Sequence, residues 1–199
     1  MNRIIIIEGV TGSGKSSVIR DLKTLLPTTT YYISEEETLG SLMQQVRDES
    51  WKAEPHFDAL EVSLRHIEQH KEKQPSEIIV VERFHPTGYA LFPYWEKLEA
   101  FDKRLFELGA CIILLSFEAS LTERRSIDRT ENNEYADVMI AYYGSRENAI
   151  AAVQTSQQRR IDALGKTRLP YLRIDTSMKD WRTYANIILA FSSGGIDNT

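Results

Sequence analysis

Short apolar runs alternate along the chain with longer segments in which apolar residues recur every three or four positions. Nearly uniform apolar runs are typical of strands buried on both faces of a parallel sheet, and the spacing in the longer segments is that of amphipathic helices. The alternation therefore predicts an α/β fold with a five-stranded parallel sheet and helices on both of its faces. The strands are expected at Arg3–Glu8, Thr28–Ile33, Ile78–Val81, Cys111–Phe117 and Tyr171–Asp175.

Helices are expected between these strands. Prolines mark their limits, because proline disfavours helix at the residue before it. Pro27 ends the first helix, Pro55 separates the second from the third, and Pro93 interrupts the fourth. The predicted helical segments are Ser17–Leu26, Thr38–Glu49, Phe57–Lys73, Ala90–Leu108, Tyr135–Leu164 and Trp181–Phe191. No linker or repeat divides the chain, so we expect one domain over residues 1–193 and a flexible tail over residues 194–199.

Composition narrows the class of protein. A chain of 199 residues with 42% apolar and 27% charged residues is typical of a globular domain with a sizeable core. Its formal net charge of −5 argues against a nucleic-acid polymer or an anionic membrane as partner. The single cysteine, Cys111, lies in an apolar run and is expected to be a buried thiol. The first strand leaves no room for a signal peptide, and no apolar run could span a bilayer, so a cytoplasmic location is expected.

The segment Gly9–Ser16 has the spacing Gly-x-x-x-x-Gly-Lys-Ser between a predicted strand and a predicted helix. Glycines let successive backbone N–H groups converge on a phosphate, and the helix N-terminus adds partial positive charge. Lys15 supplies a full charge for the outer phosphates, and the Ser16 hydroxyl can ligate Mg²⁺. We therefore expect ATP and Mg²⁺ as cofactors. The expected binding residues are Gly9, Thr11, Gly12, Ser13, Gly14, Lys15, Ser16 and Ser17.

Charged residues at later strand ends extend this predicted site. Glu82 and Arg83 follow the third strand, at the edge of an α/β sheet where ligands bind. Glu82 is expected to hold Mg²⁺ together with Ser16, directly or through water. Arg125 and Arg129 lie four residues apart after the fourth strand, so both can reach one anion. Arginines in this position can neutralise the charge of a phosphoryl group in transfer.

Several of these motifs resemble the thymidylate kinases and the deoxynucleoside kinases. Glu8-Gly9 resembles the Glu-Gly that opens the phosphate loop in both families, and Ser34–Gly40 is similar to a shortened form of the thymidylate-kinase segment Thr-Arg-Glu-Pro-Gly-Gly-Thr-x-Leu-Gly. Glu82-Arg83-Phe84 resembles Asp-Arg-Tyr of the first family and Glu-Arg-Ser of the second. The region Arg124–Arg129 resembles their arginine-bearing lid, and Arg173–Ser177 resembles the Ile-Asp-Ala-Ser near the adenine site.

The resemblance implies roles for individual residues. Glu36 matches the acid that acts as general base toward a sugar hydroxyl, although Glu35 and Glu37 are alternatives. Arg65 matches an arginine that contacts the acceptor base, with a helix-surface salt bridge as the alternative. Glu35 replaces the arginine of the family segment, and three consecutive acids suit a neutral or cationic acceptor hydroxyl better than a phosphate. The implied catalytic set is Lys15, Glu36, Glu82, Arg83, Arg125 and Arg129, and the implied acceptor contacts are Glu36, Arg65 and Arg83.

These observations predict an ATP-dependent kinase that transfers the γ-phosphoryl group to a nucleoside, a nucleoside monophosphate or a similar small molecule. A sugar alcohol or an antibiotic is an alternative acceptor. A regulatory ATPase or switch is the alternative class of function, although the absence of Asn-Lys-x-Asp and Thr-Lys-x-Asp argues against a GTPase. ATP and the acceptor are the expected partners, and the sequence is compatible with a homodimer. His85 is interpreted as a loop residue, before Pro86.

Overall fold

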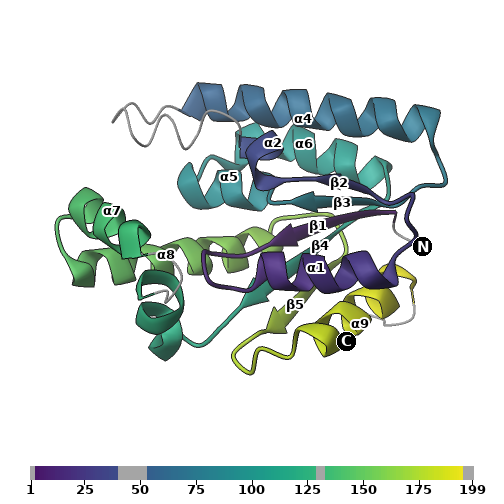
Figure 1. Ribbon diagram of the computed structural model, residues 1–199. Helices are drawn as coiled ribbons and strands as arrows, with labels where there is room; N and C mark the ends of the chain where they lie inside the picture. Colours follow the sequence, from purple (N-terminus) through teal and green to yellow (C-terminus); the bar gives the residue numbers. More distant parts are fainter. Residues whose placement is uncertain (1–2, 40–52, 129–132, 195–199) are drawn as a thin grey trace.

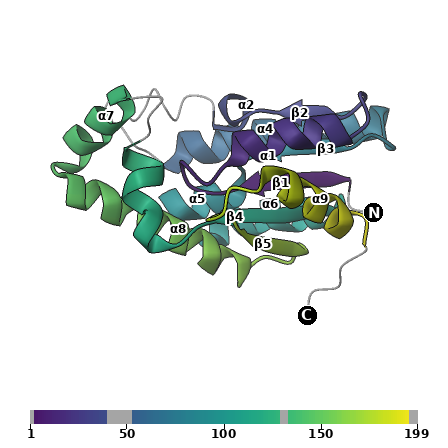
Figure 2. The ribbon, with the colours of Figure 1, turned by 60° about the horizontal axis from the view of Figure 1, so that its bottom comes forward.

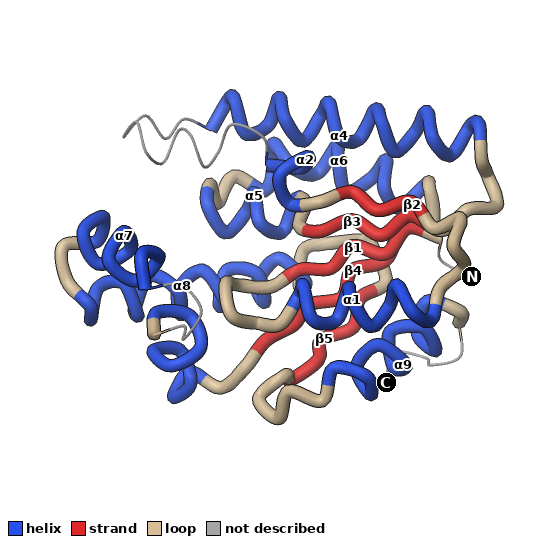
Figure 3. Tube along the Cα trace, viewed as in Figure 1, coloured by secondary structure: helices blue, strands red, loops and turns tan. Residues whose placement is uncertain are grey.

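The apolar runs form one sheet of five parallel strands in a computed structural model that describes residues 3–39, 53–128 and 133–194 (Figures 1 and 3). The strand order is β2-β3-β1-β4-β5, with β1 in the centre. Ile4 of β1 lies beside Ile79 on one side and Ala110 on the other. The expected α/β fold class is confirmed. The strands are β1 (Ile4–Glu8), β2 (Tyr31–Ile33), β3 (Ile79–Glu82), β4 (Ala110–Ser116) and β5 (Tyr171–Asp175).

Two helices, α1 (Lys15–Leu25) and α9 (Trp181–Ser192), cover one face of the sheet (Figure 1). Successive side chains of a strand point to opposite faces, and Ile5 and Ile7 of β1 pack on this side. The core on this face is completed by buried residues of the two helices, among them Val18, Leu22, Ala185, Ile188 and Phe191.

The opposite face is covered by α4 (Ala53–Lys73), α6 (Trp95–Glu107) and the C-terminal part of α8 (Arg146–Leu164). Ile4 and Ile6 of β1 point to this side. Helical spacing places the buried residues of α4 and α6 in one stripe each. These residues are Leu60, Leu64, Ile67, Leu98, Phe101 and Leu105.

The shorter elements gather where the strands end. They are α2 (Glu35–Leu39), α5 (His85–Leu91), α7 (Asn133–Tyr143), and the helical turns η1 (Ala119–Leu121) and η2 (Glu123–Ile127). A third apolar cluster joins Val10, Phe117 and Ile127 to α7 and α8. Figures 1 and 2 show α7 and the adjoining part of α8 extending beyond the sheet at the end where β1 leads into α1.

Some predicted boundaries were wrong. Pro55 lies inside the first turn of α4, where proline costs no helical hydrogen bond. The segment Ala90–Leu108 is interrupted near Pro93 as predicted, but the helix before this break, α5, already begins at His85, which therefore does not lie in a loop. The segment Tyr135–Leu164 is two helices, because Gly144 has a φ of 79° and the Ser145 hydroxyl caps α8. Most of the predicted Thr38–Glu49 helix, and residues 195–199 of the tail, lie outside the described residues.

The carboxyl ends of β1 and β3 therefore meet beside the N-terminus of α1, at the middle of the sheet. In an open α/β sheet this edge is where ligands bind. None of the helices within residues 3–39, 53–128 and 133–194 is long and apolar enough to cross a membrane.

Candidate active site

The loop between β1 and α1 has a backbone that only glycine fits at three positions. Gly9, Gly12 and Gly14 have φ values of 150°, 80° and 95°. A Cβ at Gly12 would lie 2.1 Å from the carbonyl oxygen of Arg125, and one at Gly14 would lie 2.2 Å from the Trp181 ring. Gly14 caps α1 without any side-chain hydrogen bond. The N–H groups of the first turn therefore remain available for an anion.

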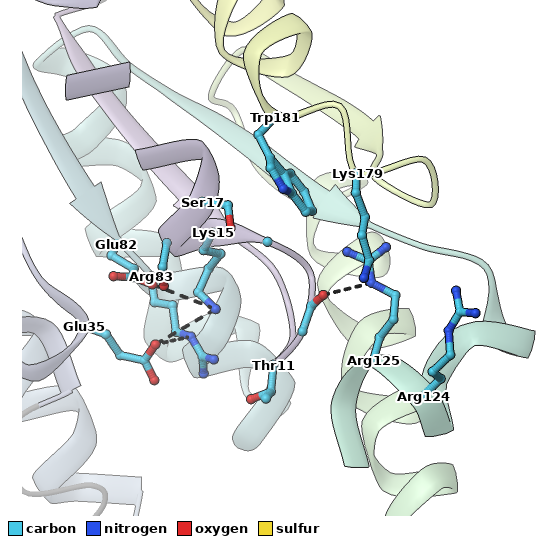
Figure 4. Close-up of a pocket in the computed structure, with 13 residues that line it drawn as sticks. Thr11, Lys15, Ser17, Glu35, Glu82, Arg83, Arg124, Arg125, Lys179 and Trp181 are labelled. Carbon is cyan, nitrogen blue, oxygen red and sulfur yellow. Dashed lines mark hydrogen bonds and ion pairs between the residues drawn. The ribbon is translucent and has the colours of Figure 1, made fainter. Parts of the chain in front are cut away.

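The loop forms the floor of a pocket of about 390 Å³. Five cationic and two acidic side chains line it, so it attracts anions although the whole chain has a net charge of −5. Figure 4 shows Lys15, Glu35, Glu82 and Arg83 on one side of the loop, and Arg124, Arg125, Lys179 and Trp181 on the other. The lining residues are Thr11, Gly12, Gly14, Lys15, Ser16, Ser17, Glu35, Glu82, Arg83, Arg124, Arg125, Lys179 and Trp181.

Two acids and two cations meet on the sheet side of the pocket. The Lys15 Nζ atom lies 3.9 Å from Glu35 Oε2 and 4.0 Å from Glu82 Oε1. The same Glu35 oxygen lies 3.0 Å from Arg83 Nε. Glu35 comes from the start of α2 and Glu82 from the end of β3, so two neighbouring strand ends place these acids around one lysine. Such an arrangement can bind phosphate and accept a proton within the same small volume.

Burial shifts the pKa values of two groups in this cluster. Desolvation, helped by the nearby charge of Arg83, lowers the pKa of the Lys15 ammonium to about 7, while Glu35 and Glu82 act in the opposite direction. Burial also raises the pKa of Glu82, against the attraction of Lys15. Lys15 is therefore near the midpoint of its titration at neutral pH. A bound polyanion would favour the charged lysine.

The opposite side of the pocket is tied to the loop by η2. Arg125 donates from Nε to the Gly12 carbonyl oxygen at 3.1 Å and from Nη1 to the Thr176 carbonyl oxygen at 2.8 Å. Its guanidinium lies over the Phe117 ring, 4.6 Å from the ring centre, and 5.8 Å from the centre of the Trp181 ring. Burial lowers the pKa of Arg125. Arg125 therefore fixes the loop against β5 and the aromatic residues.

A smaller cavity of about 100 Å³ adjoins the main pocket and shares Thr11 and Arg83 with it. It lies between α5, α7 and α8. Its walls are apolar apart from Thr11, Arg83, Tyr143, Ser156 and Arg160. The remaining lining residues are Val10, Leu91, Met139, Ala152 and Val153. This cavity offers space beside Arg83 for part of a second small molecule.

The residues expected to bind Mg²⁺ open onto the main pocket. Ser16 is exposed, and Glu82 is only 17% exposed and lies 4.0 Å from the Lys15 Nζ atom. The described residues contain no group of three or more histidine, cysteine or acidic side chains that could hold a metal alone. A hydroxyl and one carboxylate suit Mg²⁺ that arrives with a nucleotide, because this ion usually binds through one or two carboxylates and phosphates.

Several solved structures share this architecture. No family model matches the chain, and no curated protein sequence matches it. The Bacillus subtilis YorR protein, solved with phosphorylated GDP, is 15% identical with a TM-score of 0.61, over 98% of this chain and 99% of its own. Thymidylate kinase of Candida albicans is 14% identical with a TM-score of 0.59, over 100% and 96%. Shikimate kinase of Acinetobacter baumannii is 13% identical with a TM-score of 0.59, over 98% and 96%.

The chain has the P-loop kinase fold. In this fold the loop Gly9–Ser16 is the P-loop. Of its predicted binding residues, Thr11, Gly12, Gly14, Lys15, Ser16 and Ser17 line the main pocket. Gly9 and Ser13 do not line it: Ser13 is fully buried, and a Cβ at Gly9 would lie 2.3 Å from the Ser13 hydroxyl. These two residues shape the P-loop from beneath.

The other predicted residues have three different outcomes. Glu82, Arg83 and Arg125 line the main pocket around the P-loop. Glu36 is exposed and does not line it, and the acid that faces Lys15 is Glu35. Arg65 lies exposed on α4 and donates to Glu61 at 2.8 Å, as the salt-bridge alternative predicted. Arg129 lies outside the described residues.

Three residues around the P-loop were not found from the sequence. Trp181 and Lys179 line the pocket from the segment after β5, where only the resemblance near Arg173–Ser177 pointed to a nucleotide. Arg160 is 2% exposed in the middle of α8, and nothing in the spacing of its helix marks it. The signal that would have found Arg160 is its pairing with buried Glu8, which only the fold shows.

Proposed function

We propose that the protein is a Mg²⁺- and ATP-dependent kinase of a small molecule with a free hydroxyl group. The observation that carries this proposal is the position of Glu35. Its carboxylate lines the main pocket, 3.9 Å from the P-loop lysine and 3.0 Å from Arg83, and Arg83 also lines the smaller cavity. An acid in this position can receive a proton next to a bound triphosphate.

In the proposed reaction the P-loop N–H groups and Lys15 bind the β- and γ-phosphates. The acceptor oxygen forms a bond to the γ-phosphorus while the bond from that phosphorus to the β–γ bridging oxygen breaks, and ADP leaves. The acceptor hydroxyl gives its proton to Glu35, and Arg83 stabilises the charge on the transferred group. Mg²⁺ held by Ser16 and Glu82 would neutralise charge on the β- and γ-phosphate oxygens.

The pairing of Glu35 with Arg83 favours an uncharged acceptor. A monophosphate acceptor would bring its own negative charge close to the Glu35 carboxylate, which lies 3.0 Å from Arg83. The names of the structural neighbours include kinases of acceptors with and without a phosphate group, since a gluconokinase and a shikimate kinase stand beside thymidylate and deoxyadenosine kinases. A nucleoside, or a polyol of similar size, is therefore the acceptor class that we propose, in a cytoplasmic protein that binds neither a membrane nor a nucleic-acid polymer.

The test is ATP turnover with Mg²⁺ against paired acceptors: nucleosides, the matching monophosphates, sugar alcohols, sugar acids and aminoglycosides. The phosphorylated product is identified by its mass. We expect one uncharged acceptor to raise turnover strongly, while its monophosphate does not. Turnover with the monophosphate alone would overturn the acceptor class. A protein that binds ATP but transfers phosphate to no acceptor would be a nucleotide-dependent switch, and its output would be a partner interaction.

A further inference from the structure

Arg83 has a backbone conformation that is unusual for a residue with a side chain. Its φ is 61°, in the left-handed region, where a non-glycine residue costs about 1–2 kcal/mol. The strand-end N–H group of Arg83 donates to the Ile7 carbonyl oxygen at 3.0 Å, which continues the β1–β3 ladder by one residue. The chain then turns sharply into α5. Such strain persists only where the surroundings hold the backbone from several sides.

Glu8, at the end of β1, holds the backbone immediately after Arg83. Its carboxylate is fully buried and accepts from the Phe84 N–H at 2.7 Å and the Thr87 N–H at 3.2 Å. Its other oxygen accepts from the Thr87 hydroxyl at 2.8 Å. Phe84 precedes α5 and its side chain makes no capping hydrogen bond. The carboxylate of Glu8, from β1, takes over this capping role for the Phe84 and Thr87 N–H groups.

Arg160 of α8 completes this arrangement from the other side. Its Nε donates to Glu8 at 3.3 Å and its Nη2 to the Thr87 hydroxyl at 3.0 Å. Nη1 donates to the carbonyl and hydroxyl oxygens of Ser156, at 3.0 and 2.6 Å. All three nitrogens of the Arg160 guanidinium therefore donate hydrogen bonds, and the residue is only 2% exposed. A buried carboxylate left without its cation typically costs about 3–5 kcal/mol, so each member of the pair requires the other.

We infer that Glu8 and Arg160 form a positioning pair for Arg83: they fix the left-handed turn from which Arg83 reaches the phosphates. This inference rests on the proposed function only in that Arg83 is taken to contact the bound phosphates. Arg160 itself does not line the main pocket. It acts through Glu8, Phe84 and Thr87. The helix α8 also begins with Arg146, which donates to Glu123 of η2 and to Asp128 just after it. One helix therefore links Arg83 to the η2 side of the pocket.

A simpler role for Arg160 is to add positive charge near the phosphates. Its charge is close enough to contribute to the lowered pKa of Lys15. Substitution of Arg160 by lysine distinguishes the two roles. Lysine keeps the charge but lacks the planar fork that bonds Glu8, Thr87 and Ser156 at once. Arg160→Lys therefore separates positioning from charge.

The experiment is calorimetric binding of inorganic tripolyphosphate at pH 6, where Lys15 is charged in the free protein. Four full-length proteins form a cycle: wild type, Arg83→Met, Arg160→Lys and the double variant. We expect Arg83→Met to weaken binding about 10–100-fold, the value of a charge-assisted hydrogen bond. Arg160→Lys should weaken it by a similar factor alone, and by less than twofold in the Arg83→Met background.

A second readout does not involve any ligand. The exchange of the Phe84 and Thr87 amide protons, followed by nuclear magnetic resonance, should accelerate at least tenfold in Arg160→Lys, while amides of β4 keep their protection. Arg159→Gln is the matched control. Arg159 neighbours Arg160 on α8 and donates to the Ala90 carbonyl oxygen of α5, but has no bond to Glu8. It should leave both readouts unchanged. If Arg160→Lys does not fold, Ser156→Ala loosens the same guanidinium by one bond and replaces it in the cycle.

Two results would overturn the positioning role. One is wild-type tripolyphosphate binding in Arg160→Lys, which would mean that charge alone matters. The other is a full additive loss in the double variant, which would mean that Arg160 acts independently of Arg83. Neither of these binding results depends on which acceptor the protein uses. If wild-type protein transfers phosphate to no acceptor while the binding cycle behaves as expected, the proposed function fails and the positioning pair stands.

Discussion

The two sides of the main pocket are built differently. On the sheet side, Lys15 and Arg83 share the carboxylate of Glu35. The opposite side, the lid side, is formed by η2 and Trp181. On it, Arg125 is bonded to backbone carbonyl oxygens and lies over aromatic rings, beside Trp181. A buried lysine with a pKa of about 7 beside two carboxylates suits proton and phosphoryl transfer, whereas a cation fixed by backbone and rings suits holding a nucleotide. We therefore expect substitutions on the sheet side to lower kcat and those on the lid side to raise the KM for ATP.

The largest effect is expected from Lys15→Met. Removal of the only P-loop ammonium should lower kcat about 100–1,000-fold, as for other groups that stabilise transition-state charge. The measurement is formation of phosphorylated product from the acceptor that raises ATP turnover in the test of paired acceptors. Arg20→Gln, an exposed change on the same helix, is the control and should be near wild type. Full transfer activity in Lys15→Met would remove the P-loop from the reaction.

Glu35→Gln and Glu36→Gln form a matched pair that separates the acid in the pocket from its exposed neighbour. Glu35→Gln should lower kcat for a hydroxyl acceptor about 100-fold, the typical value of a general base. It should also tighten tripolyphosphate binding, because Arg83 loses its competing carboxylate. Glu36→Gln should change neither measurement by more than about twofold. The opposite ranking of the two variants would restore Glu36 as the base.

On the lid side, Trp181→Leu should raise the dissociation constant of ATP about tenfold, within the range for loss of one stacked base, with little change in kcat. The expectation follows from the position of the Trp181 ring over Gly14 and beside Arg125. Trp95→Phe, on α6 and away from the pocket, is the control. A large fall in kcat at saturating ATP would show that the two sides are not separate in function.

The pH dependence of ATP binding gives the smallest effect. The free protein has a Lys15 pKa of about 7, and bound phosphates favour the charged form, so binding takes up a proton above pH 7. The charged fraction falls from about one half at pH 7 to about one tenth at pH 8, which predicts an affinity loss of about fivefold. Calorimetry at pH 8 in two buffers of different ionisation enthalpy measures the uptake. Lys15→Arg, which does not titrate in this range, should show none; proton release by the wild type would contradict the lowered pKa.

The fold could be predicted from the sequence because its strands are uniformly apolar and its P-loop has a fixed spacing. The limits of the sequence reasoning lie where a residue's role depends on distant contacts. Which of three consecutive acids faces Lys15 depends on where α2 starts, one residue after Ser34, whose side chain bonds Glu37. His85 is fully buried, and its ring nitrogen Nε2 lies 3.1 Å from the carboxylate of Asp102 on α6, a partner that the sequence does not reveal. Arg160 has no local signal at all.

The left-handed turn at Arg83 has a consequence for the engineering of this protein. Glycine would relax that backbone and would be favoured by any selection for thermal stability alone. The same replacement would delete the guanidinium that faces Glu35. Thermal stability therefore favours glycine at position 83, whereas turnover requires arginine. A library screened only for survival at high temperature should accumulate inactive Arg83→Gly clones.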